Sequence, residues 1–297
     1  MTQADQKNKE IFILQEANQY FQSQNYEKSV ASYQQAIEDE PQNTYNYWYL
    51  GLSLLLQGKE EEAQQVWFSL LLTDNEDELE ELSQQLCSIL QKEIDHQETL
   101  YNYQIASTLR QYIREINPEF LDETVIRLNI GGTQKHPEWK ILDIEHRPEV
   151  DYVGNAANLE QFADHSLDMI YTSHVFEHFY YQLNDELVTT LKEWYRVLKP
   201  SGKLLISVPN LKTLCWLYLN PNLTYLDRHH IMRIMFGGQT NQYDVHKVGF
   251  DVDILALYLQ KAGFNQYQVV PEFNLFEDCS SLKILNTYIS LNVIATK

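Results

Sequence analysis

Hydrophobic residues recur at helical spacing in the stretch that precedes residue 116. Between residues 78 and 115, leucine and isoleucine return every three or four positions, first at Leu79, Leu82, Leu86, Ile89 and Leu90, then at Leu100, Ile105, Leu109 and Ile113. This spacing puts the apolar side chains on one face of an α-helix, and it therefore predicts two helices. Because Asn117-Pro118 follows and proline cannot continue a helix, we expect the helical part to end there.

The first 80 residues repeat with a period of 34, which pairs Ala17 with Gly51, Tyr33 with Trp67, Ala36 with Leu70, and Pro41 with Asn75. That period is typical of helix-turn-helix repeats stacked in arrays. Small residues suit the close crossing of paired helices, and Gly58 suits a turn between them. Such arrays need about three units to be stable, so we expect residues 78–115 to form a degenerate third repeat.

Short apolar runs replace the helical pattern after Val125. They predict strands at residues 125–130, 140–144, 150–154, 167–173, 203–208 and 291–297. Between the fourth and fifth runs, Leu187, Leu191, Trp194 and Leu198 form the apolar stripe of a helix. Strand, helix and strand in succession predict parallel pairing and an α/β sheet.

Small or polar residues follow four of these predicted strands. Ligands of open α/β sheets bind at the carboxyl ends of the strands, so these residues are candidates for one site. Glycines allow a close approach of the backbone to a ligand, a carboxylate can accept the hydroxyl protons of a ribose, and an amide can pair with a base edge. In strand order the residues are Gly131-Gly132, Asp143, Asn155-Ala156 and Ser173-His174.

Two parts of the chain resemble known families. The segments ANQYFQSQNYEKSVASYQQAIEDEPQN and YWYLGLSLLLQGKEEEAQQVWFSLLLTDNED resemble the tetratricopeptide repeat. LNIGG, DYVGNAANLEQFADHSLDMIYTSHVFEHF and LKEWYRVLKPSGKLLISVPN are similar to class I S-adenosylmethionine-dependent methyltransferases, in particular to the type 11 domain. These resemblances imply an all-α repeat domain over residues 1–116 and a Rossmann-like α/β domain, with a mixed and mostly parallel sheet, over residues 117–297.

The methyltransferase resemblance implies roles for the strand-end residues. S-adenosylmethionine is the implied cofactor, with its ribose held by Asp143 and its sulfonium beside Ser173 and His174. The residues that the resemblance implies for cofactor binding are Asn129, Gly131, Gly132, Asp143, Asn155, Ala156, Ser173 and His174. The glycine loop is shorter than is usual in that family, because only residues 133–139 separate it from the next strand.

The stretch YTSHVFEHF spaces His174, Glu177 and His178 as H-x-x-E-H, one form of a zinc-protease signature. That signature places its ligands on a single helix, whereas residues 167–173 predict a strand. The two imidazoles therefore need not converge. Zinc binding, structural packing of His178 and a place in the wall of the methyl-transfer pocket remain alternatives; we favour the pocket wall and expect no metal.

A general base for an acceptor hydroxyl is expected after LISVPN. We predict His246 and Tyr243, in the loop YDVHKVGF, as the catalytic residues, because an imidazole can accept a proton near neutral pH. A capping or core role for His246 is the alternative. His229 and His230, with Asp227 to orient them, are the second choice.

The composition of the chain limits the classes of partner and the locations that we expect. With 42 acidic and 22 basic residues the net charge is −20, which disfavours nucleic acid, and residues 1–117 carry 20 of the acids against 7 bases. Three separated cysteines suggest reduced thiols, and the absence of a long apolar run predicts no membrane span and a cytoplasmic location. The repeats are expected either to dock a protein or peptide, or only to pack on the second domain.

The leading functional hypothesis is a methyltransferase that acts on a small molecule or a glycan, with a sugar hydroxyl of a surface glycan as the first expectation for the acceptor. A protein side chain is also open. The short glycine loop motivates a second hypothesis, an interaction scaffold that has lost catalysis. A nicotinamide enzyme is the third, although the G-x-G-x-x-G pattern that a pyrophosphate requires is absent from the sequence.

Overall fold

The computed structural model describes residues 3–100, 102–121 and 125–297, with side chains from residue 12 onwards. The chain divides into two compact units, Met1–Asp122 and Glu123–Lys297. The first unit extends past residue 116, because a 3₁₀ turn, η1 (Pro118–Phe120), follows and Phe120 and Leu121 pack on the helical core.

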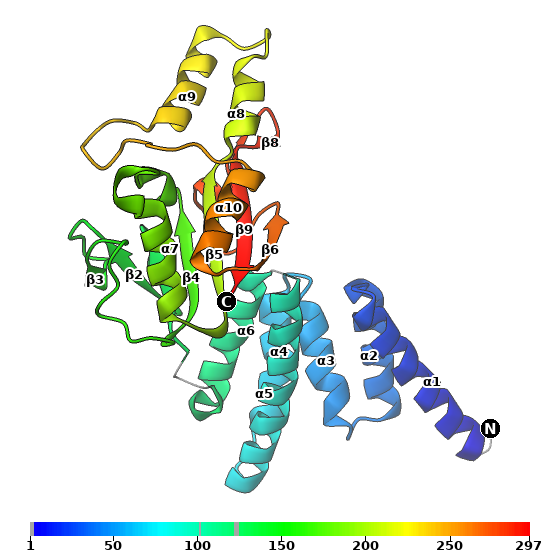
Figure 1. Ribbon diagram of the computed structural model, residues 1–297. Helices are drawn as coiled ribbons and strands as arrows, with labels where there is room; N and C mark the ends of the chain where they lie inside the picture. Colours follow the sequence, from blue (N-terminus) through cyan, green and yellow to red (C-terminus); the bar gives the residue numbers. More distant parts are fainter. Residues whose placement is uncertain (1–2, 101, 122–124) are drawn as a thin grey trace. The chain divides into compact units, whose positions relative to one another are not determined.

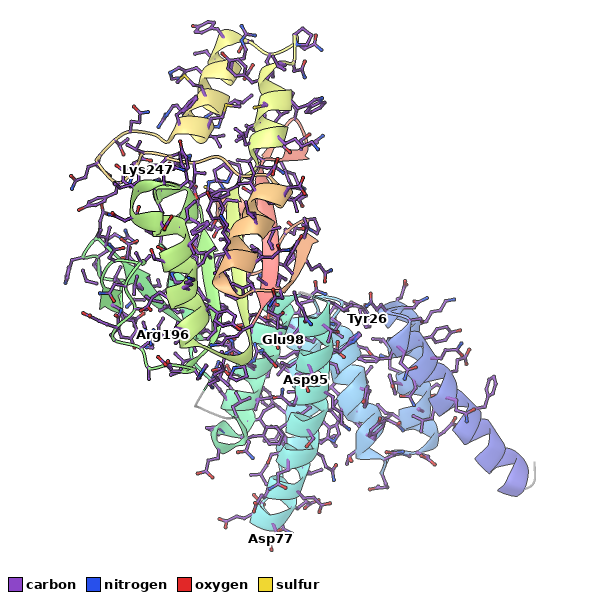
Figure 2. The ribbon with its side chains drawn as sticks, in the orientation of Figure 1. Tyr26, Asp77, Asp95, Glu98, Arg196 and Lys247 are labelled. Atoms are coloured by element: carbon purple, nitrogen blue, oxygen red, sulfur yellow. The ribbon has the colours of Figure 1, made fainter. Side chains whose placement is uncertain are left out.

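The first unit is a series of paired helices (Figure 1). They are α1 (Gln3–Gln22), α2 (Tyr26–Asp39), α3 (Thr44–Leu55), α4 (Glu60–Leu71), α5 (Glu76–Thr99) and α6 (Tyr103–Ile116). Gln24 and Gly58, both with left-handed φ, lie in the turns that join α1 to α2 and α3 to α4. Helices α5 and α6 occupy the region predicted for the third pair, but α5, at 24 residues, is twice as long as α4. Figure 2 shows Asp77 and Asp95 towards opposite ends of α5.

Gly51 allows α3 and α4 to cross closely. A Cβ atom at this position would lie 2.1 Å from Nε1 of Trp67, which is 1% exposed. The same Nε1 donates a hydrogen bond of 3.1 Å to the carbonyl oxygen of Trp48. The small residue inferred at this point of the repeat is therefore required by the indole that packs against it.

The second unit contains a seven-stranded sheet in the order β3-β2-β1-β4-β5-β9-β6. Its strands are β1 (Arg127–Ile130), β2 (Trp139–Asp143), β3 (Tyr152–Val153), β4 (Leu167–Ser173), β5 (Leu198–Pro209), β6 (Gln266–Val270) and β9 (Ser290–Thr296). Strand β9 runs antiparallel to both of its neighbours, and the pairs from β3 to β5 are parallel. The predicted fold class, helical repeats with a mostly parallel α/β sheet, is confirmed.

Helices cover one face of the sheet and extend beyond one end of it (Figure 1). They are α7 (Glu186–Val197), α8 (Leu211–Tyr218), α9 (Tyr225–Phe236) and α10 (Val252–Ala262), with 3₁₀ turns η2 (Phe176–His178), η3 (Leu183–Asp185) and η4 (Cys279–Ser281). Helices α7 and α10 contribute Trp194 and Leu259 to the main core, whereas α8 and α9 form a small core with Ile289. A two-stranded sheet, β7 (Lys283–Ile284) and β8 (Thr287–Tyr288), completes the unit.

Aromatic side chains pack on the opposite face, where the short connection between β1 and β2 supplies no helix in the described residues. The ring of Tyr171 lies 4.8 Å from that of Phe276 and 5.6 Å from that of Phe273, and Trp139 packs on both Tyr171 and Phe276. Nowhere in the described parts of the chain does a helix combine the length and the apolarity needed to cross a bilayer.

Gly51→Ala tests the close crossing of α3 and α4. Alanine normally favours a helix by about 1 kcal/mol over glycine, but overpacking against Trp67 costs about 1–3 kcal/mol, so we expect a net loss of stability. Chemical denaturation followed by circular dichroism measures it. Ser88→Ala on the exposed face of α5 is the control and should change little. A Gly51→Ala protein more stable than the parent would contradict the crossing.

Candidate active site

The parallel register brings the ends of the first four strands to one edge of the sheet. Ile130, the last residue of β1, pairs with Leu142 of β2 and with Thr172 of β4. Asp143 pairs in turn with Val153 of β3. The residues that follow these positions are the predicted strand-end residues, and they therefore lie together.

Two neighbouring cavities open at this edge. One, of about 400 Å³, is lined among others by the predicted residues Gly131, Asp143, Asn155, Ala156, His174 and Tyr243. The other, of about 490 Å³, is lined among others by Asn129, Gly131, Gly132, Ser173 and His174. Gly131 and His174 line both. We call the first the Asp143 cavity and the second, which is also lined by Asp278, the Asp278 cavity.

The turn after β1 requires its glycines. Gly131 has φ of +78°, in the left-handed region, and a Cβ atom there would lie 2.4 Å from a methyl carbon of Val175. At Gly132 a Cβ atom would lie 2.4 Å from the side-chain amide of Asn129. The amide of Gly131 donates a 2.8 Å hydrogen bond to the carbonyl of Leu142, which ties the turn to β2. At Gly131, therefore, backbone atoms without a side chain border both cavities.

Asp143 is held in place with part of its hydrogen-bonding capacity free. Its Oδ1 accepts a 2.8 Å hydrogen bond from the amide of Glu145, and its Oδ2 accepts one of 3.1 Å from Arg147. Arg147 also donates to the carbonyl of Gly132 at 2.8 Å, so it links the first two strand ends. An ionised carboxylate has about four acceptor positions, so two remain, which matches the two hydroxyls of a ribose.

Helix α7 positions the segment that follows β3. Nε1 of Trp194, which is fully buried, donates a 2.8 Å hydrogen bond to the carbonyl of Ala156. Glu193 accepts a 2.9 Å hydrogen bond from the amide of Leu159. Asn155 accepts one from the amide of Ala157, which forms a local turn and directs this segment into the Asp143 cavity.

The Asp278 cavity contains a carboxylate that the sequence did not identify. Asp278 accepts hydrogen bonds from the hydroxyls of Tyr171 at 2.7 Å and Ser173 at 3.2 Å, and from the amide of Ser280 at 2.8 Å. Burial raises the pKa of Tyr171, so this hydroxyl stays a donor. Asp278 lies more than 100 positions from Tyr171 and Ser173 in the chain, and no spacing in the sequence connects it to them.

His174 and its neighbours surround a buried carboxylate. His174 has φ of +54°, and burial lowers its pKa to about 3. Burial raises the pKa of Glu177 to about 8. The sequence predicted that the two histidines of the H-x-x-E-H stretch need not converge, but both lie near this carboxylate, together with His246. Nδ1 of His174 and Nε2 of His246 are each 3.7 Å from Oε1 of Glu177. The rings of His178 and His246 are 4.8 Å apart.

The two predicted catalytic residues occupy different environments. Tyr243 is 50% exposed and lines the Asp143 cavity. His246 is mostly buried, lines neither cavity, and has its pKa lowered to about 4 by burial. His178 does line the Asp143 cavity, and its ring lies 4.8 Å from that of His246. The second choices, His229 and His230, are exposed on α9 and line neither cavity.

Trp194→Phe tests the hydrogen bond by which α7 holds the segment that follows β3, residues 155–159. It leaves the buried carbonyl of Ala156 without its donor, which costs about 1–3 kcal/mol of unfolding free energy. Urea titration followed by circular dichroism measures this loss, and hydrogen exchange should rise at residues 155–159. Trp216→Phe, at a site that is 64% exposed, is the matched control and should stay within about 0.5 kcal/mol of the parent. Equal effects of both substitutions would contradict the link.

Comparison with known proteins identifies both parts of the chain. A family model described as a methyltransferase domain matches residues 120–206, and one described as a TPR repeat matches residues 17–58. Curated proteins yield no match.

Solved structures similar to this chain include three methyltransferases. A provisionally assigned O-methyltransferase from Nostoc punctiforme PCC 73102 is 14% identical, with 60% of this chain and 54% of that chain covered and a TM-score of 0.37; this chain thus spans about half of that protein. A SAM-dependent methyltransferase from Archaeoglobus fulgidus is 18% identical, with 64% and 94% covered and a TM-score of 0.37. The 1,6-didemethyltoxoflavin-N1-methyltransferase of Burkholderia thailandensis is 17% identical, with 58% and 71% covered and a TM-score of 0.36.

The two family matches fall on the segments whose sequences resemble these families. Both resemblances are therefore confirmed. The chain thus joins a TPR repeat, matched at residues 17–58, to a methyltransferase domain, matched over residues 120–206.

Proposed function

We propose that this protein transfers a methyl group from S-adenosylmethionine to an acceptor molecule. The family match supports the reaction class, and the observation that carries the proposal is the Asp143 cavity. Gly131, Asp143 and Asn155, from three different strand ends, line that one space. Gly131 offers backbone atoms without a side chain, Asp143 a carboxylate with two free acceptor positions, and Asn155 an amide. These groups suit a nucleoside whose sulfonium lies near His174.

The chemistry requires positioning more than reactive groups. Methyl transfer is an in-line displacement in which the cationic sulfonium becomes a neutral thioether, so no covalent nucleophile on the protein is needed. Holding the methyl group and the acceptor in line supplies about 7–11 kcal/mol of the barrier. The fixed turn at Gly131 and the α7 anchor at Ala156 give the rigidity that this requires.

Tyr243 and His246 are the residues that we propose for the acceptor. Tyr243 lines the Asp143 cavity, which supports our proposal that its hydroxyl contacts the acceptor. His246 acts through His178, against which its ring packs, so we assign it a positioning role. A base contributes about 10²–10⁴-fold to the rate when the acceptor is a hydroxyl. We propose a sugar hydroxyl as that acceptor and a cytoplasmic location for the protein.

Asp143→Asn tests the donor site. The substitution keeps the shape of the side chain but replaces its two anionic acceptors, so we expect the affinity for S-adenosylhomocysteine, measured by calorimetry, to fall by about 10- to 100-fold. Asp253→Asn, at an exposed position in the first turn of α10, should bind like the parent.

The parent protein supplies the decisive comparison for this experiment. If it bound neither S-adenosylmethionine nor S-adenosylhomocysteine at millimolar concentration, the methyltransferase proposal would fail and the non-catalytic scaffold would be the better explanation. If Asp143→Asn bound as tightly as the parent, the ribose would not lie at Asp143. Binding of NADH to the parent, abolished by Asp143→Asn, would instead favour the nicotinamide alternative.

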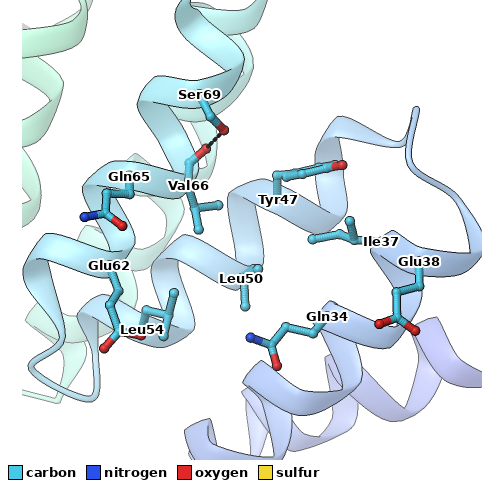
Figure 3. A pocket seen from close by; sticks show the side chains of 10 residues that line it. All are labelled: Gln34, Ile37, Glu38, Tyr47, Leu50, Leu54, Glu62, Gln65, Val66 and Ser69. Carbon is cyan, nitrogen blue, oxygen red and sulfur yellow. Dashed lines mark hydrogen bonds between the residues drawn. The ribbon is translucent and has the colours of Figure 1, made fainter.

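We propose that the TPR repeats dock a basic peptide. A cavity of about 600 Å³ opens between α2, α3 and α4 (Figure 3). Leu50 and Leu54 form part of its floor, and the exposed acids Glu38 and Glu62 belong to its lining. Apolar side chains bordered by carboxylates suit a peptide with both apolar and basic residues. The excess of acids over bases in residues 1–117 adds a favourable field for such a partner.

Charge reversal tests the docking site. Glu38→Lys with Glu62→Lys should weaken binding of a fluorescent peptide of alternating leucine and lysine by at least about fivefold, measured by anisotropy at low salt. Glu76→Lys with Glu80→Lys, on exposed positions of α5, changes the net charge equally and controls for the general field. Equal losses in the two double variants would place binding outside this cavity, and no binding to the parent would favour a purely structural role for the repeats.

A further inference from the structure

Glu177 is a buried carboxylate without a hydrogen-bond donor in the described structure. Its side chain is 1% exposed, and neither Oε1 nor Oε2 has a hydrogen-bond partner there. Buried carboxylates in proteins are paired, hydrogen-bonded or bound to a metal ion, because an uncompensated one costs several kcal/mol. The groups around Glu177 therefore decide what it does.

The hydrogen bonds of two neighbouring histidines fix which of their nitrogens carry protons. Ser290 donates its hydroxyl proton to the carbonyl of Cys279 at 2.7 Å, so at 2.8 Å it must accept a proton from Nε2 of His174. Nδ1 of neutral His174, which is 3.7 Å from Oε1 of Glu177, is therefore unprotonated. Nδ1 of His178 donates to the carbonyl of Val245 at 3.1 Å, which leaves Nε2 of His178 unprotonated.

A third imidazole completes the group from a distant part of the chain. Nε2 of His246 lies 3.7 Å from Oε1 of Glu177, and its Nδ1 has no partner among the described residues. One ligand atom from each of Glu177, His178 and His246 can be chosen so that all lie within 4.8 Å of one another. These three residues can therefore offer a carboxylate oxygen and imidazole nitrogens to one point, where a cation would compensate the buried carboxylate.

We propose that Glu177, His178 and His246 bind a divalent first-row transition metal ion, with solvent at its remaining position. A carboxylate oxygen and imidazole nitrogens are the ligands that zinc and its neighbours accept. Metal–ligand distances of about 2.0–2.2 Å place the ligands of a tetrahedral site about 3.3–3.6 Å apart. The 3.7 Å separation between Oε1 of Glu177 and Nε2 of His246 reaches that range with a small contraction.

The surroundings of the proposed ligands favour a metal site. Ligand histidines usually donate their second nitrogen to a carbonyl, a carboxylate or another polar group, which fixes the ring. The carbonyl of Val245 does this for His178. His178 also lines the Asp143 cavity, so the ion would lie beside that space. Metal binding at this site is independent of the methyl donor.

Metal content tests the proposal directly. The full-length protein is stripped with a chelator, incubated with zinc or manganese chloride, freed of excess metal, and measured by plasma mass spectrometry. We expect about one ion per chain for the parent with at least one of these metals. Glu177→Gln and His246→Ala should each weaken binding by at least about 100-fold in calorimetry with the same salt, because each removes one of the ligands. His229→Ala, on exposed α9, should bind like the parent.

Measurements on the parent alone keep the test decisive if a variant does not fold. Cobalt(II) bound in tetrahedral geometry at this site should give a visible absorption band, and zinc should raise the melting temperature of the stripped parent. A parent protein that takes up less than about a tenth of an equivalent of every metal and shows no shift would overturn the proposal, in favour of a protonated Glu177. Undiminished uptake in a folded Glu177→Gln or His246→Ala variant would overturn it as well. Metal uptake without donor binding would contradict only the methyltransferase proposal.

Discussion

The parallel pairing of β1 with β2 and β4 is the constraint on which the rest of the second unit depends. With Ile130 level with both Leu142 and Thr172, the next residues of all three strands emerge at one edge of the sheet. The strand order also reverses between β1 and β4, and this is where open α/β sheets bind ligands. A slip of one residue in β1 would turn Leu128 and Ile130 out of the core, so burial itself holds this edge in register.

Each strand end is then fixed by contacts that come from elsewhere in the fold. The amide of Gly131 donates a hydrogen bond to β2, and Arg147 donates hydrogen bonds to both Asp143 and Gly132. Trp194 of α7 donates one to the carbonyl of Ala156. The short connection after β1 leaves the opposite face of the sheet to aromatic rings packed around Tyr171. The site is therefore preorganised by packing and hydrogen bonds, which suits chemistry that depends on positioning.

Local patterns made most of the architecture predictable, whereas long-range contacts did not appear in them. The strands around Leu128 and Ile170 are rich in apolar residues, and the site residues come directly after them in the sequence. Strand β6 was not predicted because its side chains are mostly exposed and form no apolar run. Asp278 and His246 reach their neighbours only through the tertiary fold: 105 positions separate Asp278 from Ser173, and His246 lies on a loop far in sequence from Glu177.

The central claim is that four strand ends hold one sulfonium nucleoside. A crystal structure of the full-length protein with S-adenosylhomocysteine tests it most directly. Our account predicts the ribose hydroxyls on Asp143, the adenine beside Asn155 and the sulfur near His174. Electron density for the ligand outside the Asp143 cavity, or a ribose without contact to Asp143, would contradict it.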